Sequence, residues 1–432
     1  MATSSTHAEL AKRHEAVMPS WLSLFYERPI EIASGDGCRV TDGEGRTYLD
    51  FFAGILTNML GYNVPEVRDA IKAQADRGVV HTSTLYLIRQ QVDLAEKIAS
   101  LSGIPDAKVF FTASGTEANE AALLIATQYR RSNQVIALRN SYHGRAFATV
   151  GITGNRGWSA SSLTPVNTIY AQSGYRFRSS FRELDDAAYI AACAEDLREL
   201  MVTSTSGDVA CMIAEPIQGV GGFATPPDGL FAAYKEILDE TGILFVSDEV
   251  QTGWGRTGDH FWGIGAHGVT PDAMTFAKGL GNGASIGGVV ARGEVMDCLQ
   301  ANSISTFGGN PLSTAAANAT LDYALSHDLQ GNAARVGAVL IEGLRAACAD
   351  LAYVGEVRGR GLMIGIELVA ADGRTPDVAA AARVLEAARE RGLLIGKGGL
   401  HGNCLRIAPP LTLTESEARE GLAMLVDALR TS

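Results

Sequence analysis

The chain has 432 residues, 46% of them hydrophobic, so it carries enough apolar side chains for one or two substantial cores. Its formal net charge is −12 without a cluster of Lys and Arg, and nucleic acid is therefore not an expected partner, because phosphate binding requires a basic surface. No run of 18 apolar residues occurs, so the sequence predicts no membrane-spanning helix and no membrane partner.

The first 13 residues lack the apolar core of a signal peptide, which favours a cytoplasmic protein. The six cysteines are scattered, form no Cys-x-x-Cys pair and have no His at metal-ligand spacing. This pattern is typical of reduced thiols in that compartment, and it predicts neither a disulfide nor a metal site.

The first predicted element is a β-hairpin over residues 38–50, whose Asp-Gly-Glu-Gly turn is expected to supply residues with positive φ. From about residue 65 to residue 300, short apolar segments alternate with helical stretches. Strands are predicted at 109–111, 134–138, 209–214, 243–247, 273–277 and 286–291. Apolar strands separated by helices indicate a mainly parallel sheet that is covered on both faces.

Towards the C-terminus, strands are predicted within residues 354–369 and 404–408. A last helix is expected to open at Thr414, because Thr414 and Glu417 have the spacing of a capping box. The sequence therefore predicts an α/β fold with two domains. The expected boundaries are residues 63–311 for a large domain, and residues 1–62 with 312–432 for a smaller α+β domain.

Polar residues follow the predicted strands where each strand ends. Ser114, Gly115 and Thr116 come after strand 109–111 and open an Ala- and Leu-rich helix, where free N–H groups and hydroxyls would attract a phosphate. The same residues could serve only as a capping box between Ser114 and Glu117, and the two interpretations are compatible.

A second loop, Tyr142-His-Gly-Arg145, leaves strand 134–138. Tyr142 could stack on a planar cofactor ring, and Arg145 could bind a substrate carboxylate through its fork of N–H donors. The alternatives are simple packing for Tyr142 and an ordinary hydrogen-bonding surface role for His143.

Asp248 and Lys278 each follow a buried strand. A desolvated carboxylate such as that of Asp248 needs a cationic partner, and a protonated pyridine nitrogen would supply one. The amine of Lys278 enters a glycine turn, where it could form a Schiff base. Together they are the pair that pyridoxal phosphate requires, although a helix-capping Asp and a solvated Lys remain the alternatives.

Seven segments, in order, resemble the class III aminotransferases of the type I pyridoxal phosphate fold. They are Ser-Gly-Thr-Glu-Ala-Asn at 114, Tyr-His-Gly at 142, Glu-Pro-Ile-Gln-Gly at 215, Asp-Glu-Val-Gln-Thr-Gly-Trp-Gly-Arg at 248, Ala-Lys-Gly at 277, Ser-Thr-Phe-Gly-Gly-Asn-Pro at 305 and Val-Arg-Gly-Arg-Gly-Leu-Met at 357. The resemblance covers nearly the whole chain, and it implies an enzyme with this fold and with pyridoxal 5′-phosphate as its cofactor.

The resemblance also implies roles around the cofactor. Lys278 would hold it as a Schiff base and move a proton, and Asp248 would bind the pyridine nitrogen. The other expected cofactor contacts are Ser114, Gly115 and Thr116 at the phosphate, Tyr142 and Val250 on the two ring faces, Gln251 at the ring oxygen, and Glu215 nearby. Thr306 would reach the phosphate of a neighbouring subunit, which implies a homodimer with active sites at the interface.

On the substrate side, the resemblance implies that Arg406 binds the α-carboxylate of the amino or 2-oxo acid. Glu215 would pair with Arg406 when the substrate lacks that carboxylate, and Ser305 is placed beside the substrate. For Arg406, the alternative is a purely structural ion pair.

The expected reaction is a ping-pong transfer of an amino group from a small-molecule donor to a 2-oxo acid acceptor. Several segments are most similar to the alanine:glyoxylate type, which implies alanine or an ω-amino acid as donor and glyoxylate or pyruvate as acceptor. Arg145 and Ile55 are instead similar to the 4-aminobutyrate and acetylornithine types, which use 2-oxoglutarate. An aminomutase or decarboxylase on the same scaffold is the alternative class. A ligand-sensing regulator is not expected, because the first 35 residues are too short and too weakly basic for a DNA-binding module.

Overall fold

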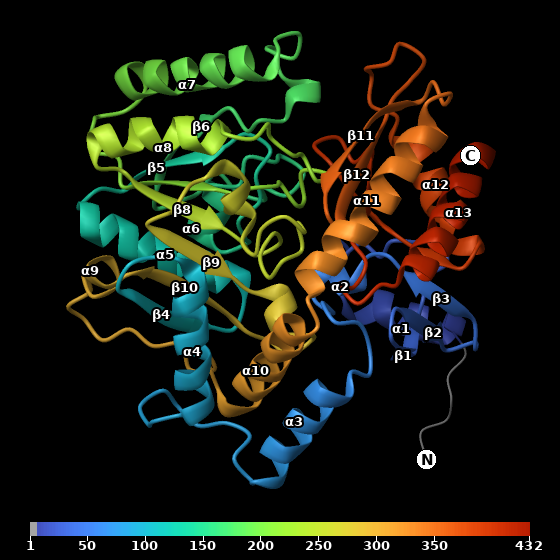
Figure 1. The fold of residues 1–432 in the computed structure, drawn as a ribbon, viewed down its shortest axis with the longest axis horizontal. Helices are drawn as coiled ribbons and strands as arrows, with labels where there is room; N and C mark the ends of the chain where they lie inside the picture. The colour runs from blue at the N-terminus through green and yellow to red at the C-terminus, as the bar shows by residue number, and fades with distance from the viewer. Residues whose placement is uncertain (1–6) are drawn as a thin grey trace.

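The computed structural model describes residues 7–432, which form three β-sheets and the helices around them (Figure 1). The largest sheet has seven strands in the order β4-β10-β9-β8-β7-β5-β6. Their bounds are β4 Ala107–Thr112, β5 Gln134–Leu138, β6 Asn167–Ala171, β7 Cys211–Ala214, β8 Leu244–Asp248, β9 Ala273–Phe276 and β10 Gly287–Arg292. Strands β6, β5, β7, β8 and β9 are parallel, whereas β10 runs antiparallel to both β9 and β4.

Apolar side chains alternate between the two faces of this sheet, as the geometry of a β-strand requires. On β5, Val135 and Ala137 belong to a core that includes α5, whereas Ile136 and Leu138 face a core shared with other helices. Helix α5 (Gly115–Arg130) therefore covers one face. The opposite face is covered by α4 (Arg89–Ser102), α7 (Asp186–Thr203), α8 (Leu230–Thr241) and α10 (Pro311–Ser326).

Two smaller sheets contain residues from both ends of the chain. One has the order β1-β2-β3-β13, with β1 Ile32–Asp36, β2 Arg39–Asp42, β3 Thr47–Asp50 and β13 Leu393–Leu394. The other has the order β11-β12-β15-β14, with β11 Val354–Arg360, β12 Met363–Leu368, β14 Gly396–Gly398 and β15 Cys404–Ile407. Because β3 pairs in parallel with β13, the N-terminal strands lie beside the C-terminal helices (Figure 1).

The remaining helices connect these sheets or cover them. They are α1 His7–Val17, α2 Ala53–Leu56, α3 Pro65–Asp76, α6 Phe147–Gly151, α9 Gly293–Met296, α11 Leu329–Cys348, α12 Val378–Glu390 and α13 Glu415–Thr431, with 3₁₀ turns η1 Arg176–Arg178, η2 Gly263–His267 and η3 Lys278–Gly281. Helix α13 begins with the predicted capping box, in which Thr414 and Glu417 exchange hydrogen bonds. Helix α10 begins with Pro311 and is capped by Asn310.

The expected α/β architecture with a mainly parallel, mixed sheet is confirmed, and so is the hairpin at residues 38–50. Two expectations were wrong or incomplete. Strand β6 was not predicted, and in the hairpin turn only Gly45 has positive φ, at 86°. The domain boundaries at residues 62 and 311 stay a prediction, and residues 1–6 of the first segment lie outside the described residues.

Within residues 7–432, no helix is long and apolar enough to cross a membrane. All six cysteines are free. No group of three or more His, Cys, Asp or Glu side chains in this part of the chain could hold a metal ion. The cytoplasmic location stays a prediction.

Candidate active site

The ends of the sheet strands surround one cavity of about 350 Å³. Strands β5, β7 and β8 are parallel, so the loops that follow them emerge at the same edge of the sheet. Strand β4 lies at the end of the sheet and pairs antiparallel with β10, so it runs in the same direction as these strands and delivers the start of α5 to that edge. Of the predicted site residues, the cavity is lined by Ser114, Gly115, Thr116, Tyr142, Glu215, Asp248, Val250, Gln251 and Lys278.

Asp248 is the last residue of β8, and only 3% of its side chain is exposed. Its Oδ2 lies 2.7 Å from both Nδ1 of His143 and Nδ2 of Asn119. Its Oδ1 accepts a hydrogen bond from the backbone N–H of Val250. No Lys or Arg forms an ion pair with Asp248 within residues 7–432, so three hydrogen-bond donors hold a buried carboxylate at the wall of the cavity.

His143 and Asn119 were not predicted as site residues. Asn119 Nδ2 also donates to the backbone oxygen of His143 at 2.8 Å, so this helix residue binds both the loop that carries His143 and the carboxylate of Asp248. The signal available in the sequence was their position inside the segments that begin at Ser114 and Tyr142. A hydrogen-bonding surface role was left open for His143 as the alternative, but its side chain is fully buried.

Lys278 follows β9 and begins the 3₁₀ turn η3, with φ of 46° in the left-handed region. A lysine is uncommon in this conformation, and the close approach of Gly279 to Met59 shows how tightly the turn is packed. Burial, and after it the charge of Arg406, lower the pKa of Lys278, whereas Asp248 and Glu215 raise it, and the net pKa is about 8. The turn therefore presents an amine that is more readily neutral than an ordinary lysine.

Glu215 follows β7, and it accepts hydrogen bonds from the backbone N–H groups of Tyr142 and Gly219, both at 2.8 Å. Burial raises the pKa of Glu215 to about 7, while His143 lowers it and Asp248 raises it. The pKa of this carboxyl group is thus close to neutral pH, and backbone donors from two different loops hold the group in place.

Arg406, on β15, does not line the cavity, but it is buried directly beside it. Its guanidinium lies between the rings of Phe223 and Phe52, at 4.7 and 5.1 Å from their centroids. Its Nη2 donates to Oε1 of Gln251 at 2.9 Å. Burial lowers the pKa of Arg406 to about 10, with Glu215 opposing that effect. No carboxylate forms an ion pair with Arg406 in the described part of the chain.

Four predicted substrate or partner contacts lie outside this cavity lining. Arg145 is exposed, and its guanidinium lies 5.0 Å from the ring centroid of Trp21. Ile55 is 45% exposed and Thr306 is exposed. Ser305 donates from its hydroxyl to Oε2 of Glu117 at 3.3 Å. Within the single chain, these residues are therefore not gathered around Lys278.

The first turn of α5 closes one end of the cavity. Ser114 caps the helix by accepting from the N–H of Glu117, whose carboxylate accepts from the N–H of Ala113. A Cβ on Gly115 would lie 3.0 Å from Val250, and a Cβ on Gly144 would lie 2.8 Å from Oγ1 of Thr116. Glycine at these two positions therefore leaves space next to the N–H groups and the hydroxyl of the helix terminus.

The family model of the class III aminotransferases matches residues 26–429. The chain belongs to the class III aminotransferases. Enzymes of this class depend on pyridoxal phosphate, so this aminotransferase does too. Its expected type I fold is confirmed by a solved amine transaminase from an uncultivated Pseudomonas species in a pyridoxal-phosphate-bound form, with a TM-score of 0.88, 33% identity and 96% of each chain covered.

Among curated relatives, this aminotransferase is similar to alanine–glyoxylate aminotransferase 2 homolog 2, mitochondrial, of Arabidopsis thaliana. The two are 42% identical over 95% of this chain and 84% of the relative. It is also similar to acetylornithine aminotransferase of Methanothermobacter thermautotrophicus, at 36% identity over 92% of this chain and 93% of the relative. These relatives bear the names of both substrate types that the sequence segments resemble.

Proposed function

We propose that this class III aminotransferase transfers the amino group of alanine or an ω-amino acid to pyruvate or glyoxylate in a ping-pong reaction. The observation that carries the proposal is that Lys278 and Asp248 line the same cavity, the first with a lowered pKa and the second without a cationic partner. Amino transfer needs a buried amine that exchanges protons near neutral pH and a carboxylate that stabilises a protonated ring nitrogen.

The residues around the cavity fit pyridoxal phosphate. Asp248 would hold the pyridine nitrogen, since a buried carboxylate is stabilised by a cation and no Lys or Arg within residues 7–432 forms an ion pair with it. Gly115 and Thr116, at the start of α5, would hold the phosphate through N–H groups and a hydroxyl, with Ser114 capping that helix. Tyr142 and Val250 would contact the ring faces, as expected from the sequence.

When bound, pyridoxal phosphate supplies a sink for the electron pair released when the substrate Cα–H bond breaks. Lys278 would hold the cofactor and then carry the proton from Cα. Gln251 accepts from Arg406 through Oε1, which leaves its Nε2 as a donor for the ring oxygen. Glu215, with a pKa of about 7, would occupy the side of the cavity nearest to Tyr142.

Arg406 is proposed to bind the substrate α-carboxylate, because it is a buried guanidinium that forms no ion pair with a carboxylate within residues 7–432. Glu215 would neutralise it when the amino donor lacks that group. The buried pair of aromatic rings around Arg406 holds the guanidinium plane in one orientation.

A second substrate class rests on Arg145. Its exposed guanidinium contacts only the face of Trp21 among the ring contacts of the described residues, and it could turn to a distal carboxylate. Together with the sequence similarity at Ile55, this favours 4-aminobutyrate or acetylornithine as donor and 2-oxoglutarate as acceptor. The similarity to an acetylornithine aminotransferase supports this alternative.

We also propose a homodimer with active sites at its interface. Thr306 and Ser305 are followed by Phe307, whose side chain is 61% exposed. Elsewhere in the chain, the side chain of Leu87 is 98% exposed. Such exposed apolar side chains are typical of an interface rather than of a free surface. In the dimer, Thr306 would contribute to the phosphate site of the neighbouring subunit.

Borohydride reduction of the purified protein tests the central assignment. Mass spectrometry should find the reduced cofactor attached to Lys278, and Lys278→Ala should remain folded without this adduct and without turnover. Normal transamination by Lys278→Ala would overturn the proposal.

Substrate class is tested by a panel of amino donors against pyruvate, glyoxylate and 2-oxoglutarate. The aminomutase or decarboxylase alternative is tested by following the cofactor absorbance during a half-reaction with and without a 2-oxo acid. An aminotransferase should stop after one half-reaction until the 2-oxo acid is added, whereas continued product formation without acceptor would favour the alternative.

A further inference from the structure

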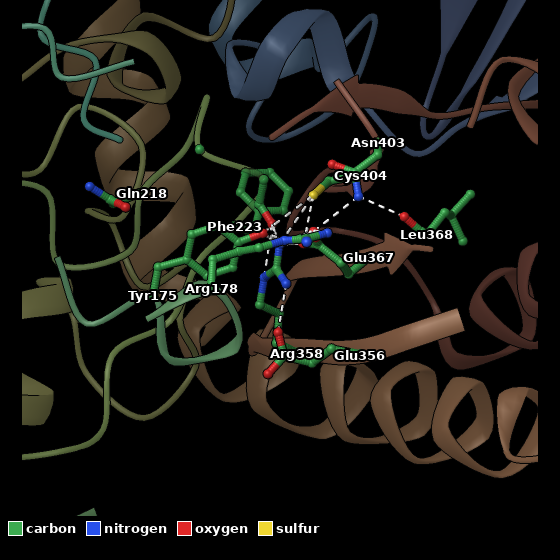
Figure 2. A network of polar contacts seen from close by, with 12 residues as sticks. Tyr175, Arg178, Gln218, Phe223, Glu356, Arg358, Glu367, Leu368, Asn403 and Cys404 are labelled. Atoms are coloured by element: carbon green, nitrogen blue, oxygen red, sulfur yellow. Dashed lines mark hydrogen bonds and ion pairs between the residues drawn. The ribbon is translucent and has the colours of Figure 1, made fainter. Parts of the chain in front are cut away.

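Residues 219–223 form a segment between the cavity and a buried ionic network on the sheet that contains β11, β12 and β15. Figure 2 shows this network around Arg358 and Glu367, with Cys404 and Phe223 nearby. The segment comes directly after Glu215 and carries Phe223, which contacts Arg406.

The network begins with Arg358 on β11 and Glu367 on β12, whose side chains are 6% and 0% exposed. Nη2 of Arg358 lies 2.9 Å from Oε2 of Glu367, and Nη1 lies 2.6 Å from Oε2 of Glu356. The other oxygen of Glu367 accepts from Arg178 at 2.7 Å and from Asn403 at 3.0 Å (Figure 2). Two guanidinium groups and two carboxylates thus balance in charge within the core.

Arg358 also reaches beyond this network to the backbone of the segment. Its Nε and Nη2 donate to the carbonyl oxygen of Gly222 at 3.1 and 2.8 Å. A Cβ on Gly222, which has φ of 89°, would lie 2.7 Å from Sγ of Cys404, and a Cβ on Gly365 would lie 2.4 Å from the oxygen of Gly222. The segment is therefore pressed against β12 and β15. Arg358 holds it at Gly222, while Nδ2 of Asn140 donates to the oxygen of Gly221 and the N–H of Gly399 donates to the oxygen of Val220.

The other end of the segment contacts the active-site residues. The N–H of Gly219 donates to Oε2 of Glu215 at 2.8 Å, and a Cβ on Gly219 would lie 2.1 Å from Nε2 of Gln251. Gln251 in turn accepts from Arg406, which lies over the ring of Phe223. Glu215 and Arg406, the two residues proposed to respond to the substrate carboxylate, therefore both contact this segment.

We propose that Arg358 is a positioning residue for substrate-carboxylate recognition, because it holds residues 219–223 in the conformation that places Glu215, Gln251 and Arg406. This inference rests on the proposed role of Arg406. It assigns to Arg358 a larger effect on substrates whose α-carboxylate binds Arg406 directly than on amines that lack a carboxylate.

The geometry requires arginine rather than lysine. One planar guanidinium serves Glu356, Glu367 and Gly222 at the same time, through donors that point in different directions. An ammonium group carries its three donors on a single atom and cannot span these acceptors. Arg358→Lys therefore preserves the charge but releases part of the network.

Arg360 provides a matched control two residues along β11. It pairs with Asp228 and Asp259, whose side chains are 62% and 37% exposed, and neither of these ion pairs involves residues 219–223. Arg360→Lys makes the same substitution on the same strand. The main difference between the two variants is that Arg358 binds residues 219–223 and Arg360 does not.

The test follows two half-reactions of the holoenzyme by cofactor absorbance. Pyruvate is added to the enzyme in its pyridoxamine phosphate form, and isopropylamine, which has no carboxylate, is added to the pyridoxal phosphate form. In Arg358→Lys, the concentration of pyruvate for half-maximal rate should rise about 10-fold, while the rate constant with isopropylamine should change less than about twofold. Hydrogen exchange should increase in a peptide spanning residues 217–224. Arg360→Lys should match the wild type in all three measurements.

Arg406→Ala separates this inference from the proposed function. If it leaves pyruvate binding unchanged, the proposed carboxylate site is wrong. If it weakens pyruvate binding and Arg358→Lys does not, or if Arg358→Lys impairs both half-reactions equally, only the positioning role is overturned. Should Arg358→Lys fail to fold, Glu356→Gln, which removes a partly exposed partner, should shift pyruvate binding in the same direction, and an unchanged value would overturn the inference.

Discussion

Nδ1 of His143 lies 2.7 Å from Oδ2 of Asp248, and both side chains are almost completely buried. Because an ionised carboxylate only accepts hydrogen bonds, this geometry makes Nδ1 of His143 the donor. Asn119 donates to the same oxygen at 2.7 Å. The carboxylate is thus held in one orientation at the cavity wall, where it meets the proposed ring nitrogen.

Asp248→Asn should fold but lower kcat by about 10²–10³-fold, because the amide cannot stabilise a positive charge on the ring nitrogen. Steady-state kinetics with saturating pyridoxal phosphate would measure this loss. Asp322→Asn, which changes an exposed partner of Lys97, is the matched control and should retain wild-type kcat. A wild-type kcat in Asp248→Asn would contradict the proposed role.

His143→Phe should have a smaller effect, about 10-fold on kcat, because Asn119 and the N–H of Val250 still bind Asp248. His143→Gln, which can retain a donor, should fall between this variant and the wild type. Parallel kinetics on the two variants would measure the difference. An effect of His143→Phe as large as that of Asp248→Asn would show that the imidazole does more than orient the carboxylate.

The pKa of about 8 for Lys278 predicts the pH dependence of its reactivity in the apoprotein. At pH 7, about 10% of the amine is neutral, against about 0.03% for an ordinary pKa of about 10.5. The rate at which pyridoxal phosphate attaches to Lys278, trapped by borohydride, should therefore rise with pH and level off above about 8.

Arg406 provides the control for this pH profile. Its positive charge lowers the pKa of Lys278, so Arg406→Met should move the midpoint to higher pH. Lys397→Met, which removes a cation from β14, should leave the midpoint in place. A profile that keeps rising to about pH 10.5 in the wild type would contradict the lowered pKa.

Arg145→Ala should raise KM for 4-aminobutyrate about 10-fold and change KM for alanine less than about twofold, because only the first donor carries a distal carboxylate. Arg145→Lys should show an intermediate KM, since it keeps the charge but loses the fork of donors. Initial rates with both donors measure this difference. Equal changes for the two donors would argue against the distal-carboxylate role.

Glu367→Gln should destabilise the protein by about 3–5 kcal/mol, because it leaves Arg358 and Arg178 buried beside a neutral group. Glu415→Gln removes one partner of an exposed pair with Arg419 and should cost less than about 0.5 kcal/mol. Denaturant unfolding of the two variants measures the contrast. Similar midpoints for both would show that the buried network contributes little.

The same network predicts acid sensitivity. Burial raises the pKa of Glu367, but Arg358 and several hydrogen bonds lower it, for a net value of about 2 against 4.5. The stabilisation is therefore present above pH 4.5 and is lost as the pH falls towards 2. Unfolding of the wild type at pH 5 and pH 3 should show this loss, and Glu367→Gln should lack it.

Much of the large sheet could be predicted from the sequence, because fully buried strands consist of short runs of apolar residues. The run at residues 134–138 became β5 with the same bounds. Strand β6, Asn167–Ala171, escaped prediction because it lies at the sheet edge, where half-buried Thr and Tyr replace a continuous apolar pattern. The antiparallel direction of β10 could not be predicted either, since the pattern of apolar and polar residues depends on burial and not on strand direction.

The sequence alone was sufficient to indicate which residues carry the chemistry, because Asp248 and Lys278 each follow an apolar strand and such strands end at a shared edge of the sheet. What only the tertiary structure decided is which neighbours control them. His143 looked like a surface residue, and Arg358 belonged to a motif without an assigned task. Their roles depend on contacts between segments far apart in the chain, 105 residues for His143 with Asp248 and 136 for Arg358 with Gly222, and local sequence patterns contain no information on such distances.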